Sequence, residues 1–135
     1  MRTVITALTV FGGCTAARQY LADHNRKSEY WEGRIRLTTR WNNGAAFDLP
    51  IPARALPLAS AAALGLLWAV RRTHPLGAGL VLGGGLSNLH ERIQYGRVYD
   101  YVQFPKAPKP FRRYIFNLAD FSIFVGAVLL LFKKR

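Results

Sequence analysis

Residues 118–132 read LADFSIFVGAVLLLF, an apolar block interrupted by one acid, Asp120. The block is somewhat shorter than the roughly 20 residues that a helix needs to cross the hydrocarbon core of a bilayer. A carboxylate at the mouth of such a helix costs on the order of 2 to 3 kcal/mol, so its presence indicates a function. The block therefore predicts a short membrane helix with a functional acid near its start.

Three further blocks have the same character, at residues 4–22, 55–70 and 76–89. Hydrophobic residues make up 50% of the chain of 135 residues, and they are bunched into these blocks rather than spread at a regular period. The sequence therefore predicts a mainly α membrane protein, in which residues 1–135 form one integral membrane domain with four transmembrane helices.

The segments between the blocks are basic, and the formal net charge is +12. We expect membrane phospholipids with anionic headgroups as the counter-surface. The bases are scattered among apolar blocks without a recognised nucleic-acid motif, so no nucleic-acid partner is expected. Charge leaves the orientation open, because the side opposite the termini holds more bases, whereas the cluster at residues 133–135 favours cytoplasmic termini.

The single cysteine, Cys14, excludes an internal disulfide framework and a cysteine-based zinc site. We interpret it as a small buried hydrophobe in the first helix. The alternative is a lipoprotein signal peptide ending at a lipidated cysteine, but Phe11 stands where a smaller aliphatic residue is usual. Three histidines offer no metal constellation, and we interpret His90 as a solvated or interfacial side chain.

The first connecting segment has the pattern of a strand. Residues 34–41 alternate charged or polar with mostly apolar side chains, and the turn dipeptide Asn43-Gly44 follows. This predicts a small strand platform at the membrane surface, over about residues 28–50; a hairpin that only caps the bundle is the alternative. Residues 93–115 are predicted as a loop, exposed and semi-extended over 105–113.

The third block is rich in glycine, which lets helices approach closely. Such packing is the simplest interpretation. It also draws Asn88 and Arg92, one helical turn apart, toward the fourth helix.

Two acids near the end of the chain are candidates for chemistry. Asp100 follows the third block and Asp120 lies just inside the fourth, so antiparallel helices would bring their carboxyls to one membrane face. Two close carboxylates share a proton, which suits one as general base on water and the other as general acid. The alternatives are that Asp120 caps the fourth helix and that Asp100 forms a salt bridge with Arg97.

The residues around these acids resemble a known family. Residues 85–100, GLSNLHERIQYGRVYD, resemble the third signature of the lipoprotein (type II) signal peptidases, and residues 116–123, FNLADFSI, resemble their last signature. Residues 41–47, WNNGAAF, look like the family's Asn-x-Gly-Ala-Ala-Phe element. Asp23 with Lys27 resembles the acid and lysine that close the family's first helix.

The resemblance implies a four-helix bundle with an extracytoplasmic β platform and cytoplasmic termini, in the bacterial cytoplasmic membrane. It implies a membrane aspartic endopeptidase, acting as a monomer, that removes signal peptides from prolipoproteins before the diacylglyceryl-modified cysteine. No metal or cofactor is implied. Asp100 and Asp120 would be the catalytic dyad. The residues that would bind substrate or support the site are Asp23, Lys27, Asn42, Gly44, Asn88, Glu91, Arg92 and Asn117.

Two features depart from the family pattern: Glu91 stands where the family usually has aspartate, and the chain is short. Both suggest a divergent member with a specialised substrate. A noncatalytic relative that binds lipidated peptides or assists another membrane protein is the alternative function, and loss of either aspartate would be its mark. A transporter or proton carrier would place acids nearer mid-span and show an inverted repeat, which we do not find.

Overall fold

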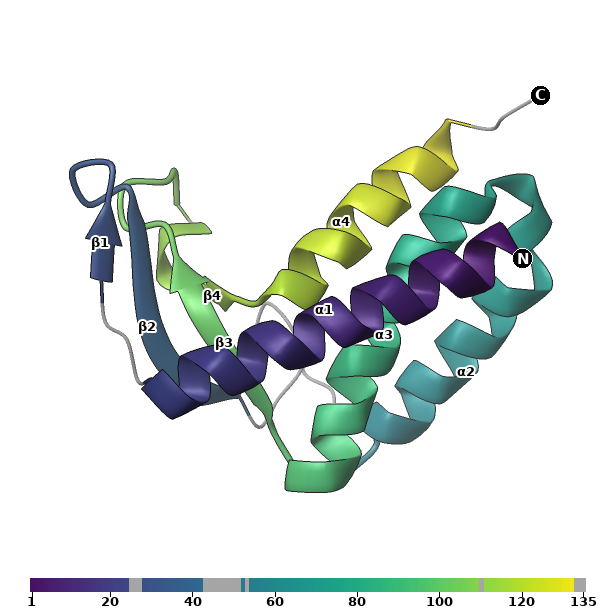
Figure 1. Cartoon of the computed structure of the whole chain (residues 1–135), viewed down its shortest axis with the longest axis horizontal. Helices are drawn as coiled ribbons and strands as arrows, with labels where there is room; N and C mark the ends of the chain where they lie inside the picture. Colours follow the sequence, from purple (N-terminus) through teal and green to yellow (C-terminus); the bar gives the residue numbers. More distant parts are fainter. Residues whose placement is uncertain (25–27, 43–51, 53, 110, 133–135) are drawn as a thin grey trace.

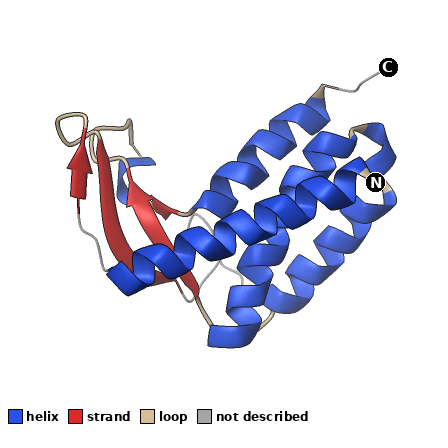
Figure 2. Cartoon of the chain, in the orientation of Figure 1, coloured by secondary structure: helices blue, strands red, loops and turns tan. Residues whose placement is uncertain are grey.

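The structure, a computed structural model, describes residues 1–24, 28–42, 52, 54–109 and 111–132. Within these residues, four helices form a bundle and four short strands form a sheet beside one end of it (Figures 1 and 2). The helices are α1 (Arg2–His24), α2 (Leu56–Ala69), α3 (Pro75–Tyr95) and α4 (Leu118–Leu131), with 3-10 turns at Arg71–Thr73 and Phe111–Arg113. The strands are β1 (Ser28–Tyr30), β2 (Ile35–Asn42), β3 (Val98–Gln103) and β4 (Ile115–Phe116). A mainly helical fold with a small antiparallel sheet is thus confirmed.

Local sequence signals set the ends of α3. Proline at its first position has no N–H to leave unsatisfied, and Nδ1 of His74 accepts a hydrogen bond from the Gly77 amide at 3.0 Å. The helix ends at Gly96, whose φ of +72° is left-handed and favours glycine. The chain then reverses directly into β3, which brings Asp100 back toward the bundle.

Helix α3 lies at the centre of the bundle and packs against the other three helices. Three consecutive glycines face three different partners, because successive residues on a helix point about 100° apart. A Cβ on Gly83 would lie 2.7 Å from the Ala7 carbonyl oxygen of α1, one on Gly84 2.6 Å from that of Ala119 in α4, and one on Gly85 2.6 Å from the Leu64 side chain of α2. The interpretation of this glycine run as close packing is confirmed.

Replacing Gly84 by alanine is expected to lower the free energy of unfolding by about 1 to 3 kcal/mol, the usual range for overpacking. The new methyl group would meet backbone of α4, which cannot rotate away. The matched control is Gly12→Ala in α1, where a Cβ meets nothing within 4 Å and helix propensity favours alanine by up to ~1 kcal/mol. Thermal unfolding in detergent checks both, and equal stability of the two variants would contradict the close contact.

The sheet is antiparallel with strand order β1-β2-β3-β4. In β2, Ile35 and Leu37 are partly covered while Arg36 and Arg40 are exposed, so the alternation predicted from the sequence is confirmed. The loop predicted over residues 93–115 is wrong at β3 and β4. Strand β3 is flanked on both sides, and residues 98–101 are all buried, so its sequence carries no alternation by which to recognise a strand.

Among the residues that the structure describes, no helix combines the length and apolar composition needed to cross a membrane. The assignment of the four helices as transmembrane spans remains a prediction.

Candidate active site

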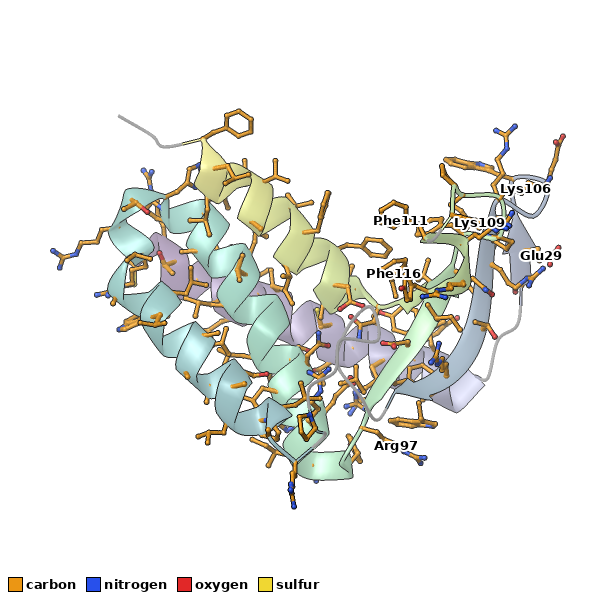
Figure 3. The ribbon with its side chains drawn as sticks, turned by 180° about the vertical axis from the view of Figure 1, so that it is seen from behind. Glu29, Arg97, Lys106, Lys109, Phe111 and Phe116 are labelled. Atoms are coloured by element: carbon orange, nitrogen blue, oxygen red, sulfur yellow. The ribbon has the colours of Figure 1, made fainter. Side chains whose placement is uncertain are left out.

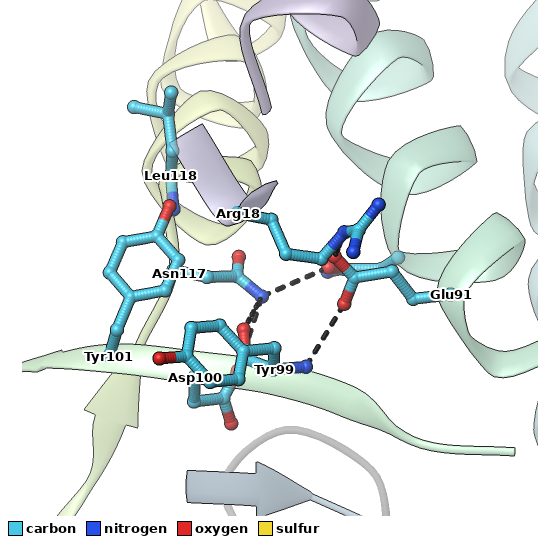
Figure 4. A network of polar contacts seen from close by, with 8 residues as sticks. Arg18, Glu91, Tyr99, Asp100, Tyr101, Asn117 and Leu118 are labelled. Carbon is cyan, nitrogen blue, oxygen red and sulfur yellow. Dashed lines mark hydrogen bonds and ion pairs between the residues drawn. The ribbon is translucent and has the colours of Figure 1, made fainter. Parts of the chain in front are cut away.

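The predicted acids lie where the sheet meets the bundle. Asp100 is in the buried part of β3, with 5% of its surface exposed, and Asp120 is in the first turn of α4. Two asparagines stand between them, Asn88 on α3 and Asn117 at the start of α4, and both are buried. Three elements distant in sequence therefore contribute to one polar cluster, of which Figure 4 shows Asp100 and Asn117.

The asparagines connect the two aspartates through hydrogen bonds. Nδ2 of Asn117 donates to Oδ1 of Asp100 and to Oδ1 of Asn88, at 3.1 Å in each case. Nδ2 of Asn88 donates in turn to Oδ1 of Asp120 at 3.3 Å. Because an amide group donates and accepts at fixed, planar positions, this chain fixes the orientation of both carboxyls. The two carboxyls are thus members of one network.

Asp120 also shapes the start of α4. Its Oδ2 accepts from the Asn117 amide at 3.0 Å, and Oδ1 of Asn117 accepts from the Asp120 amide at 2.9 Å, which is a reciprocal capping box. The helix-capping alternative for Asp120 is therefore correct, and it is compatible with the link to Asn88. Arg97 is the residue that the sequence offered as a salt-bridge partner of Asp100. Its guanidinium lies over the Trp41 ring, with Cζ 4.4 Å from the ring centroid.

Arg92 supplies positive charge close to both acids. It lies one turn beyond Asn88 and one residue past Glu91, outside the predicted span that ends at residue 89. Burial lowers the pKa of Arg92, while the negative charges of Asp120 and Asp100 raise it. A guanidinium in this position favours the ionised form of a nearby carboxyl. The predicted approach of this face of α3 to α4 is observed at Asn88, which contacts Asp120.

Glu91 ties α1, α3 and β3 together. Its Oε1 lies 2.9 Å from Nε of Arg18 in α1, and its Oε2 accepts from the Tyr99 amide at 3.0 Å, next to Asp100 (Figure 4). Burial raises the pKa of Glu91, and the Tyr99 amide and Arg18 oppose that shift. Arg18 is not among the site residues predicted from the sequence. The signal that could have indicated a buried partner is its charge inside the apolar block 4–22.

Tyr101 is a second residue that the sequence did not single out. Its hydroxyl oxygen accepts from the Leu118 amide at 2.8 Å, so it satisfies one of the free N–H groups in the first turn of α4. Burial raises the pKa of Tyr101 to about 12, so the phenol keeps its proton at neutral pH. An aromatic residue in a strand is common, and nothing in its sequence position indicated this contact.

Four predicted site residues cannot be placed in the network. Asp23 lies in the last turn of α1 and Asn42 ends β2 opposite Val98, but their side chains are outside the described part of the structure. Lys27 and Gly44 fall outside the described residues altogether. Their roles remain predictions.

The other candidates behave as simple packing residues. Cys14 is buried, as predicted, and exposed His90 packs edge-on against Phe11 with 5.7 Å between ring centroids. Within the described ranges, no three His, Cys, Asp or Glu side chains gather in a way that would hold a metal ion.

A sequence model of the family described as signal peptidase (SPase) II matches residues 7–134. The chain belongs to the signal peptidase II family. A lipoprotein signal peptidase from Nitrobacter hamburgensis is 38% identical over 108 residues, covering 71% of this chain and 66% of that protein. Another from Rhodopseudomonas palustris is 32% identical over 112 residues with the same coverage. The chain thus spans slightly less than two thirds of these relatives.

Solved structures agree with the fold. Two structures of a bacterial membrane enzyme superpose on 96% of this chain with TM-scores of 0.83 and 0.82, at 20% sequence identity. The superposed part makes up 85% and 90% of the two solved chains. At this identity the similarity concerns the arrangement of the helices and the sheet.

Proposed function

We propose that this chain is a membrane aspartic endopeptidase that removes the signal peptide from diacylglyceryl-modified prolipoproteins, just before the lipidated cysteine. The observation that carries the proposal is the pair of aspartates joined through Asn117 and Asn88. Membership of the signal peptidase II family supports the same reaction.

In this mechanism the two carboxyls hold one proton between them. The ionised carboxyl takes a proton from water, whose oxygen attacks the carbonyl carbon of the scissile peptide bond, while the protonated carboxyl donates its proton to the carbonyl oxygen. As the tetrahedral intermediate collapses, the C–N bond breaks, the amine leaves with the proton held by the first carboxyl, and the second carboxyl takes back a proton from one hydroxyl of the intermediate, so that the pair again holds one proton. Asn117, Asn88 and Arg92 orient the carboxyls and set their charge, and no metal or cofactor takes part.

Exposed apolar side chains support a place in the membrane. Large hydrophobic residues on the outer faces of the helices are mostly uncovered, including Leu8, Leu58, Leu66, Phe124 and Leu131 at 67% to 82% exposure. Apolar surface of this extent is rare on soluble monomers. We propose a monomeric multi-pass protein of the bacterial cytoplasmic membrane, with phospholipid around the helices, the site facing the extracytoplasmic side, and no nucleic-acid partner.

The termini fit this placement. The N-terminus and the end of α4 lie at the end of the bundle away from the sheet (Figure 1), as an even number of spans requires. Cleavage tests the proposal: purified protein in lipid receives a diacylglyceryl-modified precursor, and the products are read by mass. Loss of the signal peptide at the bond before the lipidated cysteine is expected, and an intact precursor would contradict the assignment.

Replacing Asn117 by serine is expected to lower the cleavage rate at least about tenfold, as misplacement of a catalytic group does. Serine caps a helix about as well as asparagine, but its hydroxyl cannot donate to both Asp100 and Asn88. Thermal unfolding should therefore stay near that of the wild type while cleavage falls. Wild-type turnover in a well-folded serine variant would show that the amide bridge is not needed.

A further inference from the structure

One end of the sheet combines exposed aromatic and basic side chains. Tyr30 at the end of β1 and Trp31 in the following turn are 47% and 74% exposed, and Phe111 in the β3–β4 connection is 50% exposed. Lys106 and Lys109 lie beside Phe111 in the same connection and are also exposed (Figure 3). We call residues 30–34, 104–109 and 111–113 the platform tip.

The two segments of the platform tip lie against each other. A Cβ on Gly33 would be 4.0 Å from Cε of Lys106, so the first turn touches the second connection. Nε2 of Gln103 donates to the Arg112 carbonyl at 3.3 Å and holds the second segment to the end of β3. The aromatic and basic groups therefore form one surface.

The backbone of the first turn is unusual. Trp31, Glu32 and Gly33 all have positive φ, of 52°, 56° and 82°. Non-glycine residues rarely adopt this conformation, and where they do the surroundings enforce it, often at functional positions. Here it presents the Trp31 indole to solvent.

The charge of this end is strongly positive. Residues 28–37 and 104–113 contain six bases and two acids, a balance of +4. One of the two acids, Glu29, forms an ion pair with Arg36, in which Oε1 of Glu29 lies 3.0 Å from Nη2 of Arg36. The bases are Arg34, Arg36, Lys106, Lys109, Arg112 and Arg113.

We propose that the platform tip docks on anionic phospholipid headgroups. Tryptophan and phenylalanine favour the headgroup level of a bilayer, and each nearby base strengthens attraction to an anionic surface, roughly fivefold in affinity. The tip is joined to α4 by packed rings, since Phe104 and Phe116 each lie 6.0 Å from Phe121 of that helix. A bilayer around α4 therefore reaches the sheet that carries the tip.

This inference rests on the membrane placement proposed above. The tip would hold β2 and β3, and with them Asp100, at a constant height over the lipid surface. It also predicts that anionic lipid, rather than lipid in general, fixes the platform.

Trp31 itself reports the contact. The full chain is reconstituted in nanodiscs that contain brominated phosphatidylcholine as a fluorescence quencher, with or without phosphatidylglycerol. The Trp31 signal is the difference between each protein and its Trp31→Phe counterpart. Phosphatidylglycerol is expected to raise Trp31 quenching about twofold or more, and about 0.5 M salt should reverse this.

Two charge variants decide the proposal. Lys106→Gln/Lys109→Gln should remove the effect of phosphatidylglycerol. The control variant Arg2→Gln/Arg72→Gln loses the same amount of charge from exposed residues at the opposite end of the bundle. Its Trp31 quenching should still respond to phosphatidylglycerol. Quenching that ignores phosphatidylglycerol, or that is equal in the two double variants, overturns the docking.

Cleavage of a lipidated precursor in the same nanodiscs separates this inference from the proposed function. Normal cleavage with invariant Trp31 quenching overturns only the docking of the tip. Lipid-dependent quenching without any cleavage supports the docking and overturns the peptidase assignment.

Discussion

Asp100→Asn and Asp120→Asn are each expected to lower cleavage of a lipidated precursor by about 10² to 10⁴-fold, the usual contribution of a general acid or base. An amide fills the space of the carboxyl but neither takes nor returns a proton at neutral pH. The measurement is single-turnover cleavage in detergent or lipid, read by mass.

Stability should change little in Asp100→Asn, because the amide oxygen can still accept from Nδ2 of Asn117. In Asp120→Asn the single amide oxygen replaces two carboxylate oxygens that accept from Asn88 and from the Asn117 amide, so a loss of about 1 to 3 kcal/mol is expected and folding is checked by thermal unfolding. Glu29→Gln is the matched control, because it removes an acid from the exposed pair with Arg36. Appreciable turnover in either aspartate variant, above that of a mock preparation, would refute the dyad.

Much of the fold was predictable because helices built almost entirely of apolar residues leave a long, simple signal in the sequence. The block 118–132 nearly coincides with α4, and the block 55–70 with α2. Helix α3 extends past its predicted end at residue 89 to Tyr95, since the helix continues through a mostly polar segment in which Glu91 is buried and Arg92 is half-buried. Hydropathy identifies only the apolar part of a helix. The polar C-terminal end of α3 is recognised in the sequence by the glycine that caps it, Gly96.

Sequence spacing predicted that the two aspartates lie near each other, but not the hydrogen bonds that connect them. Sequence spacing predicts that Asp100 and Asp120 lie at one face of the bundle, but it does not specify that Asn117 and Asn88 stand between them. Hydrogen bonds between elements depend on side-chain rotamers that tertiary packing selects. The contact between Arg18 and Glu91 has the same origin, and it joins residues 73 positions apart.

Glu91, where the sequence resemblance predicts an aspartate, has a structural role through this contact. Its side chain contacts Arg18 in α1 with one oxygen and the Tyr99 amide with the other. A buried carboxylate needs partners of this kind to remain charged. Glu91 thus anchors β3 at the Tyr99 amide, and Asp100 follows directly after the anchored residue.

A precursor that lacks the diacylglyceryl group is expected to be cleaved more slowly than the lipidated form, by a factor on the order of a hundred. Each buried methylene of the acyl chains contributes about 0.8 kcal/mol to membrane association. The precursor already has this energy when it lies in the bilayer. The acyl chains therefore speed cleavage mainly because they hold the scissile bond at the depth of Asp100 and Asp120.

Both precursors are therefore compared in the same bilayers, at equal membrane-bound concentration established by vesicle flotation. This control removes differences in partitioning and leaves only the position of the bond relative to the two carboxyls. The Asp100→Asn variant gives the background for each substrate. If the two forms are cut at equal rates, the acyl chains do not position the bond, and the chain is a general membrane aspartic protease rather than a lipoprotein signal peptidase.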